Sequence, residues 1–134
     1  MKVIRDTKSF HFYNANPKNR RTGDCVVRAI ATATGQTWDD VLTGLTEMAL
    51  EHKQMVNSPE LYGKYLEKLG WTKNKQPRKA NGKKYTGAEW VKLFKGTAVA
   101  NIGGGHVVCI KDGKVWDTWD STDGCIGNYW TKEV

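Results

Sequence analysis

The spacing of apolar residues changes along this chain of 134 residues, from helical in its first two thirds to strand-like in its last third. Apolar side chains that recur every three or four positions predict helices, which we place over 25–34, 38–53, 59–69 and 87–95. Short apolar runs predict strands, which we place over 9–13, 97–102, 106–111, 114–119 and 126–131. This order predicts an α+β fold, with N-terminal helices packed on a C-terminal antiparallel sheet.

Residues that favour helix ends support these boundaries. Thr86 is followed three positions later by Glu89, which is the spacing of a capping box. Pro59 suits the first position of a helix, because proline lacks the N–H that would be left unbonded there. Gly35 suits the end of the first helix, because glycine adopts the left-handed conformation without a steric penalty.

The aspartate–glycine pair at 112–113 is a strong signal for a two-residue hairpin turn. With this turn, His106 lies opposite Trp119, and Asp117 lies on the same face of the sheet. Asp117 is then the diagonal neighbour of His106. We therefore expect its carboxylate to accept a hydrogen bond from the imidazole ring.

A cysteine stands at the start of the first predicted helix. Asp24 precedes it and is a good helix N-cap, because its carboxylate can accept the free N–H groups of the first turn. The positive end of the helix dipole favours the thiolate form of Cys25, which is the form that attacks carbonyl groups. The alternative is that Cys25 is a small buried core residue, as free cysteines often are.

Composition limits the kind of protein this chain can be. Its length fits a single domain over residues 1–134, and no apolar run approaches the roughly 20 residues that span a bilayer. The first residues lack the apolar segment of a signal peptide, so we expect a cytoplasmic protein with no membrane association. Three widely spaced cysteines make neither a disulfide framework nor a zinc site, and no cofactor motif is visible. Among them, Cys109 lies on the opposite face of its predicted strand from His106, so we expect it in the core.

The formal net charge of +7 is concentrated in one segment. This basic segment, residues 73–84, holds no acidic residue, and without its six basic residues the chain would carry +7 − 6 = +1. The segment has no apolar period, so we expect an exposed loop. It is either a solvated loop or a contact surface for an acidic partner or nucleic acid. Its basic residues are Lys73, Lys75, Arg78, Lys79, Lys83 and Lys84.

The sequence around the first helix resembles a known family. Cys25 lies in Asp-Cys-Val-Val-Arg-Ala-Ile, followed by Ala-Thr-Gly and a helix that begins with Trp-Asp. This pattern resembles the papain-like cysteine peptidase superfamily, in the compact form of small bacterial and phage domains. That family places a cysteine at the start of a central helix, a histidine on a strand, and an asparagine or aspartate on the next strand. The resemblance implies a catalytic triad of Cys25, His106 and Asp117.

The resemblance also implies two supporting residues. The family often places an oxyanion-hole glutamine six residues before the nucleophile, where this chain has Asn19. Asn16, Asp24 and the backbone N–H of Cys25 are the other candidates for this role. The family often places a tryptophan after the acceptor, which implies that Trp119 shields the histidine from water. The chain departs from the family in lacking the Cys-Gly-Ser-Cys-Trp signature.

Three functions are consistent with these observations. The first is a thiol hydrolase (a peptidase, deconjugase or amidase) that acts on a protein or peptide through an acyl-enzyme. The second is a transglutaminase-like acyltransferase, in which an amine replaces water. The third is a non-catalytic binding module, such as a phage-encoded inhibitor of a host protein or a nucleic-acid-associated factor. Basic residues close to Cys25 could steer an acidic substrate or partner to the site; these are Lys18, Arg20 and Arg21.

Overall fold

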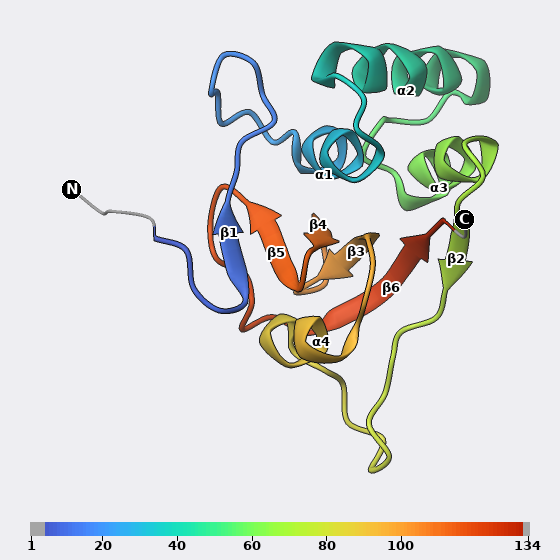
Figure 1. Ribbon diagram of the computed structural model, residues 1–134. Helices are drawn as coiled ribbons and strands as arrows, with labels where there is room; N and C mark the ends of the chain where they lie inside the picture. The colour runs from blue at the N-terminus through green and yellow to red at the C-terminus, as the bar shows by residue number, and fades with distance from the viewer. Residues whose placement is uncertain (1–4, 133–134) are drawn as a thin grey trace.

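The computed structural model describes residues 5–132, which form four helices and six strands of an α+β fold (Figure 1). The helices are α1 (Cys25–Thr34), α2 (Trp38–His52), α3 (Pro59–Lys68) and α4 (Gly87–Leu93). The strands are β1 (Phe10–Phe12), β2 (Thr72–Asn74), β3 (Ala98–Ile102), β4 (His106–Lys111), β5 (Lys114–Asp117) and β6 (Ile126–Thr131).

All six strands belong to one sheet, in the order β1-β5-β4-β3-β6-β2. The four C-terminal strands pair antiparallel, as does β2 with β6, but β1 pairs parallel to β5. The sheet is therefore mixed, and the prediction of an antiparallel sheet is wrong at this edge. The prediction also missed β2, because its residues Thr-Lys-Asn carry no apolar pattern and become a strand only by pairing with β6.

Helices cover both faces of the sheet (Figure 1). One core lies between α1–α3 and the sheet; its largest contributions from the sheet are Val99, Val107 and Trp130. The second core lies under α4, where Val91 packs with side chains from the other face of the sheet such as Ile102 and Ile110. Successive side chains of β3 and β4 point alternately into the two cores, because side chains alternate between the faces of a strand and both faces of this sheet are covered.

The helix boundaries largely follow the predicted signals. Thr86 and Glu89 form the predicted capping box, and Gly35 closes α1 in the left-handed conformation with φ 76°. Asp24 occupies the N-cap position of α1, but its side chain makes no capping hydrogen bond. The predicted position of the N-cap is therefore right, but the predicted capping hydrogen bond is wrong, because the Asp24 carboxylate is bonded to Arg28 and Trp38 instead.

The hairpin at 112–113 has the predicted register, with Lys111 opposite Lys114. Strand β5 ends at Asp117, two residues earlier than predicted. The sheet therefore brings His106, at the start of β4, next to Asp117, at the end of β5. Within residues 5–132, no helix combines the length and the apolar character needed to cross a membrane.

Candidate active site

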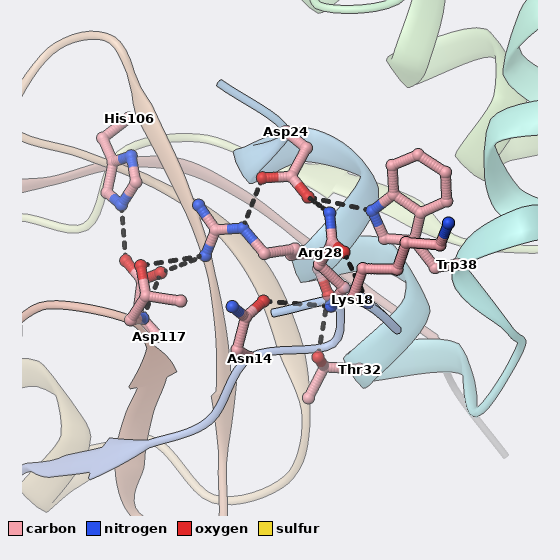
Figure 2. Close-up of polar contacts among 10 residues, drawn as sticks. Asn14, Lys18, Asp24, Arg28, Thr32, Trp38, His106 and Asp117 are labelled. Atoms are coloured by element: carbon pink, nitrogen blue, oxygen red, sulfur yellow. Dashed lines mark hydrogen bonds and ion pairs between the residues drawn. The ribbon is translucent and has the colours of Figure 1, made fainter. Parts of the chain in front are cut away.

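The predicted triad residues come together from α1, β4 and β5. The His106 Nε2 atom lies 2.5 Å from Asp117 Oδ2, which confirms the predicted hydrogen bond across the hairpin (Figure 2). The Cys25 thiol lines the same cleft as the His106 ring, and each of these two groups shifts the pKa of the other. Because Nε2 faces Asp117, Nδ1 is the ring nitrogen left for the thiol. The imidazole thus stands between a thiol and a carboxylate.

Local structure holds Cys25 at the start of α1. Gly23 turns the chain with φ 65°, two residues before the helix begins. Val26, Val27 and Ile30 are buried and anchor the helix against the sheet. As the first residue of the helix, Cys25 has a backbone N–H without an intrahelical partner. The thiol therefore lies at the end of α1 where free N–H groups and the helix dipole both favour negative charge.

A cleft of about 280 Å³ opens onto the site. Cys25 and His106 both line it, so the thiol and the imidazole can be reached from solvent. Asp117 is only 2% exposed and lies behind His106. A reacting group could therefore approach the sulfur and the ring but not the carboxylate.

Arg28 joins Asp24, just before α1, to Asp117, at the end of β5, and was not predicted as a site residue from the sequence. Its Nε donates to Asp24 Oδ1 at 2.8 Å, and a terminal guanidinium nitrogen donates to Asp117 Oδ1 at 2.6 Å (Figure 2). Arg28 lies one turn after Cys25 on the same face of α1. The spacing of Asp24 and Arg28, four residues apart on a helix, is a signal for the first of these ion pairs. No sequence signal indicates the pair with Asp117, which lies 89 residues away.

The remaining contacts of Asp24 complete this network. Its Oδ2 atom accepts hydrogen bonds from Trp38 Nε1 at 2.9 Å and from Asn16 Nδ2 at 3.1 Å. The network places two buried carboxylates around one guanidinium. Such groups are tolerated in a protein interior because each is paired and hydrogen-bonded.

Electrostatics favour the ionised forms of the Cys25 thiol and the His106 imidazole. Burial opposes ionisation of Cys25, but hydrogen bonds from His106 and the Val107 backbone, with the charges of His106 and Arg28, lower the pKa of the thiol below its usual value. Burial also disfavours the imidazolium, but the hydrogen bonds and charges of Asp117 and Cys25 outweigh it and raise the pKa of His106 to about 9. Both directions favour a thiolate–imidazolium pair over the neutral thiol and imidazole.

The same contacts keep Asp117 ionised. Burial raises the pKa of this carboxyl, but hydrogen bonds from His106, the Thr118 backbone and Arg28 together bring its pKa below the ordinary value. An ionised carboxylate fixes the orientation of the imidazole and stabilises its protonated form.

The structure does not bring Asn19 into the cleft. Asn19 is exposed, adopts φ 54°, and is not among the residues that line the cleft. The side-chain amide of Asn16 is used by Asp24 and is not free for an oxyanion. Asp24, whose pKa lies below its ordinary value, is an ionised acceptor rather than a donor. Of the predicted candidates, the backbone N–H of Cys25 fits the position best.

Trp119 lies against His106, as expected for a shielding residue. The two ring centroids are 4.8 Å apart with an interplanar angle of 35°, and Trp119 is 48% exposed. The indole also lines the cleft. It therefore covers one side of the imidazole while remaining open to a bound molecule.

The other two cysteines have different environments. Cys109 is fully buried, as predicted, and burial raises its pKa to about 12. Cys125 is exposed and lies outside the cleft. Within residues 5–132, no three histidine, cysteine or acidic side chains are grouped so that they could hold a metal ion.

The basic segment lies apart from the cleft. Lys73 is part of β2, and the residues that follow form a loop that extends on the side of the sheet away from α1 (Figure 1). Within this loop Lys79 pairs with Glu89 at 2.5 Å, and Arg78 donates to the Gly82 backbone and to Gln76. No residue of the basic segment lines the cleft that contains Cys25.

Comparison with known proteins gives no match: no protein-family model fits the chain, and no curated protein or solved structure resembles it at a significant level.

Proposed function

We propose that this chain is a cysteine-dependent hydrolase with a papain-like arrangement, in which Cys25 is the nucleophile, His106 the acid and base, and Asp117 the acceptor that orients His106. The observation that carries the proposal is the His106 ring, which is hydrogen-bonded to the buried Asp117 carboxylate and lines the same open cleft as the Cys25 thiol. A core cysteine does not require a histidine held in this way. The open cleft at the thiol also fits a nucleophile better than a packing residue.

The proposed reaction has two steps. In the first, the Cys25 thiolate attacks a carbonyl carbon, and a carbon–sulfur bond forms as the carbonyl π electrons move to oxygen. When the intermediate collapses, the carbon–nitrogen bond breaks, and protonated His106 donates its proton to the leaving amine. In the second, neutral His106 takes a proton from water, which attacks the thioester. The acid leaves, and the thiolate and imidazolium are restored.

The negative oxygen of each intermediate needs hydrogen-bond donors. The backbone N–H of Cys25 supplies one at the start of α1, where the helix dipole also favours negative charge. Arg28 acts through Asp117 and is a positioning residue. Its guanidinium fixes the second oxygen of the carboxylate whose other oxygen holds His106.

The proposal is tested by the pH dependence of Cys25 alkylation with iodoacetamide. Cys125→Ser removes the exposed competing thiol, and Cys109 is buried. We expect Cys25 to react with an apparent pKa clearly below the ordinary thiol value of about 8.5. In His106→Ala the apparent pKa should return to the ordinary range or above it, because burial then acts without the imidazolium.

His52→Ala, which removes an exposed histidine at the end of α2 and leaves His106 in place, is the matched control, and Cys25 should retain its low pKa in it. A wild-type Cys25 that is inert, or that reacts as an ordinary thiol regardless of His106, would remove the basis for catalysis. Once a substrate is found, Cys25→Ala should abolish turnover. Adding a primary amine then separates hydrolysis from acyl transfer, because only a transferase incorporates the amine faster than water.

A further inference from the structure

Two arginines line the cleft without a role in the triad. Arg20 and Arg21 precede the turn at Gly23 and line the same cleft as Cys25 and His106. Both are exposed, and neither forms an ion pair or side-chain hydrogen bond with another residue in the range 5–132. Their guanidinium groups are therefore available to a bound molecule.

The cleft wall contains no acidic side chain. Its lining residues are Arg20, Arg21, Thr22, Gly23, Cys25, Arg28, His106, Thr118 and Trp119. The nearest carboxylates are buried behind the wall: Asp24 is bonded to Arg28, and Asp117 is bonded to Arg28 and His106.

The charges at the centre of the site nearly cancel. In the proposed thiolate–imidazolium form of the site, His106 and Arg28 contribute two positive charges, and Cys25 with the two buried carboxylates contributes three negative ones. Arg20 and Arg21 then change the sum from −1 to +1. Arg20 and Arg21 therefore supply the net positive charge among the groups that line the cleft or lie directly behind it.

We propose that the substrate of Cys25 carries a carboxylate close to the carbonyl that is attacked, and that Arg20 and Arg21 bind this carboxylate. This inference rests on the proposed hydrolase function and specifies its substrate class as an acidic peptide. Guanidinium groups suit the role because their planar N–H pairs match the two oxygens of a carboxylate. The cleft lies near the lower end of the size range for ligand pockets, roughly 300 Å³. A group bound by the arginines therefore lies close to the sulfur.

The test compares two alkylating reagents that differ in charge. In both reactions the thiolate displaces iodide: a sulfur–carbon bond forms and a carbon–iodine bond breaks. Iodoacetate carries a carboxylate next to the reacting carbon, and iodoacetamide carries a neutral amide there. Because both reagents attack the same thiolate, the ratio of their rates cancels any change in the fraction ionised and reports the attraction for the carboxylate.

The variants are made in the Cys125→Ser background. The double variant Arg20→Gln/Arg21→Gln should lower the ratio of the iodoacetate rate to the iodoacetamide rate by about threefold to tenfold at low ionic strength, as expected for two exposed charges. The control Lys92→Gln/Lys95→Gln removes the same charge from exposed positions in and just after α4, on the other face of the sheet. It should leave the ratio unchanged. High salt should lower the wild-type ratio, because exposed charges are screened.

The outcomes separate this inference from the function on which it rests. If Cys25 shows the low pKa with iodoacetamide but the ratio is the same in the arginine variant, the hydrolase proposal stands and the carboxylate site is refuted. If Cys25 reacts with neither reagent, the hydrolase proposal itself fails. The wild-type preference alone is not decisive, because the His106 imidazolium also attracts an anion.

A second measurement tests the substrate class with peptides that slow alkylation of Cys25 by iodoacetamide. A glutamate-containing peptide should protect the wild-type thiol more than the matched glutamine peptide, and this difference should disappear in the arginine variant. Stronger protection by a phosphoserine peptide than by the glutamate peptide would contradict the assignment to a carboxylate and point to a phosphate instead.

Discussion

The substitution Asp117→Asn tests the electrostatics of the site most directly. It keeps the size of the side chain and a carbonyl oxygen that can accept a hydrogen bond from His106, but it removes the negative charge. The carboxylate of Asp117 is 2% exposed and lies 2.5 Å from His106 Nε2, so little solvent screens this pair. We therefore expect the largest effect of the substitution on the pKa of His106.

The expected size of the effect follows from the pKa of His106. This pKa is about 9, against an ordinary value of 6.5, which corresponds to about 3 kcal/mol in favour of the imidazolium. Asp117 is the leading stabilising contact, and Cys25 supplies the remainder. In Asp117→Asn the pKa of His106 should fall by most of this difference. The positive charge of Arg28, which then has one carboxylate partner fewer, acts in the same direction.

The assay is a pH titration of the histidine ring carbons by NMR. His106 should titrate near pH 9 in the wild type and near or below 6.5 in the variant. Cys25 alkylation should shift to higher pH in the variant, because a neutral imidazole no longer stabilises the thiolate.

Stability provides an independent check of the same reasoning. The folded-state pKa of His106 lies above the unfolded value, so stabilisation by the protonated ring is complete below about pH 6.5 and is lost as the pH rises through about 9. The difference in unfolding free energy between wild type and Asp117→Asn should therefore shrink across this interval. A variant in which His106 still titrates near 9 would refute the assignment of this shift to Asp117.

Three further predictions concern the rest of the molecule. Arg28→Met leaves two buried carboxylates without their shared cation and should lower the unfolding free energy by about 3–5 kcal/mol in urea denaturation; a loss below 1 kcal/mol would show that the network contributes little. Gly63→Ala places a methyl group 2.9 Å from the ring of Trp130 and should cost about 1–3 kcal/mol in the same assay, whereas an unchanged midpoint would show that the ring moves freely. Ellman's reagent should modify the exposed Cys125 at once and the buried Cys109 only on unfolding; rapid reaction of Cys109 in the folded protein, detected by mass spectrometry, would contradict its burial.

The parts of the site that the sequence predicted depend on local geometry. The hairpin turn at 112–113 sets the register of two adjacent strands, so the contact between His106 and Asp117 follows from counting residues in both directions. The start of α1 at Cys25 follows likewise from a glycine, an acidic residue and an apolar run. Such features are fixed within a few residues and need no knowledge of the remaining fold.

The parts that it did not predict depend on contacts between distant segments. Asp24 has the sequence signature of a helix cap, yet its carboxylate bonds to Arg28, Trp38 and Asn16. In the buried site these partners stabilise the charged carboxylate more than the free N–H groups of the helix would. Strand β2 has three residues and exists through pairing with β6, and no local signal indicates that the predicted strand at 9–13 pairs parallel to β5. Asn19 lies at the expected sequence distance from Cys25, but the left-handed turn there takes it away from the cleft.

The position of β6 in the sheet has a consequence for biosynthesis. This last strand lies between β3 and β2, so the sheet has a gap until residues near 131 have been made. Cys25 is synthesised 117 − 25 = 92 residues before Asp117. A nascent chain on the ribosome therefore carries Cys25 without Asp117 for several seconds at the usual rate of roughly 5–20 residues per second. The hydrogen bond from His106 to Asp117 and the ion pair between Arg28 and Asp117 can form only after this interval.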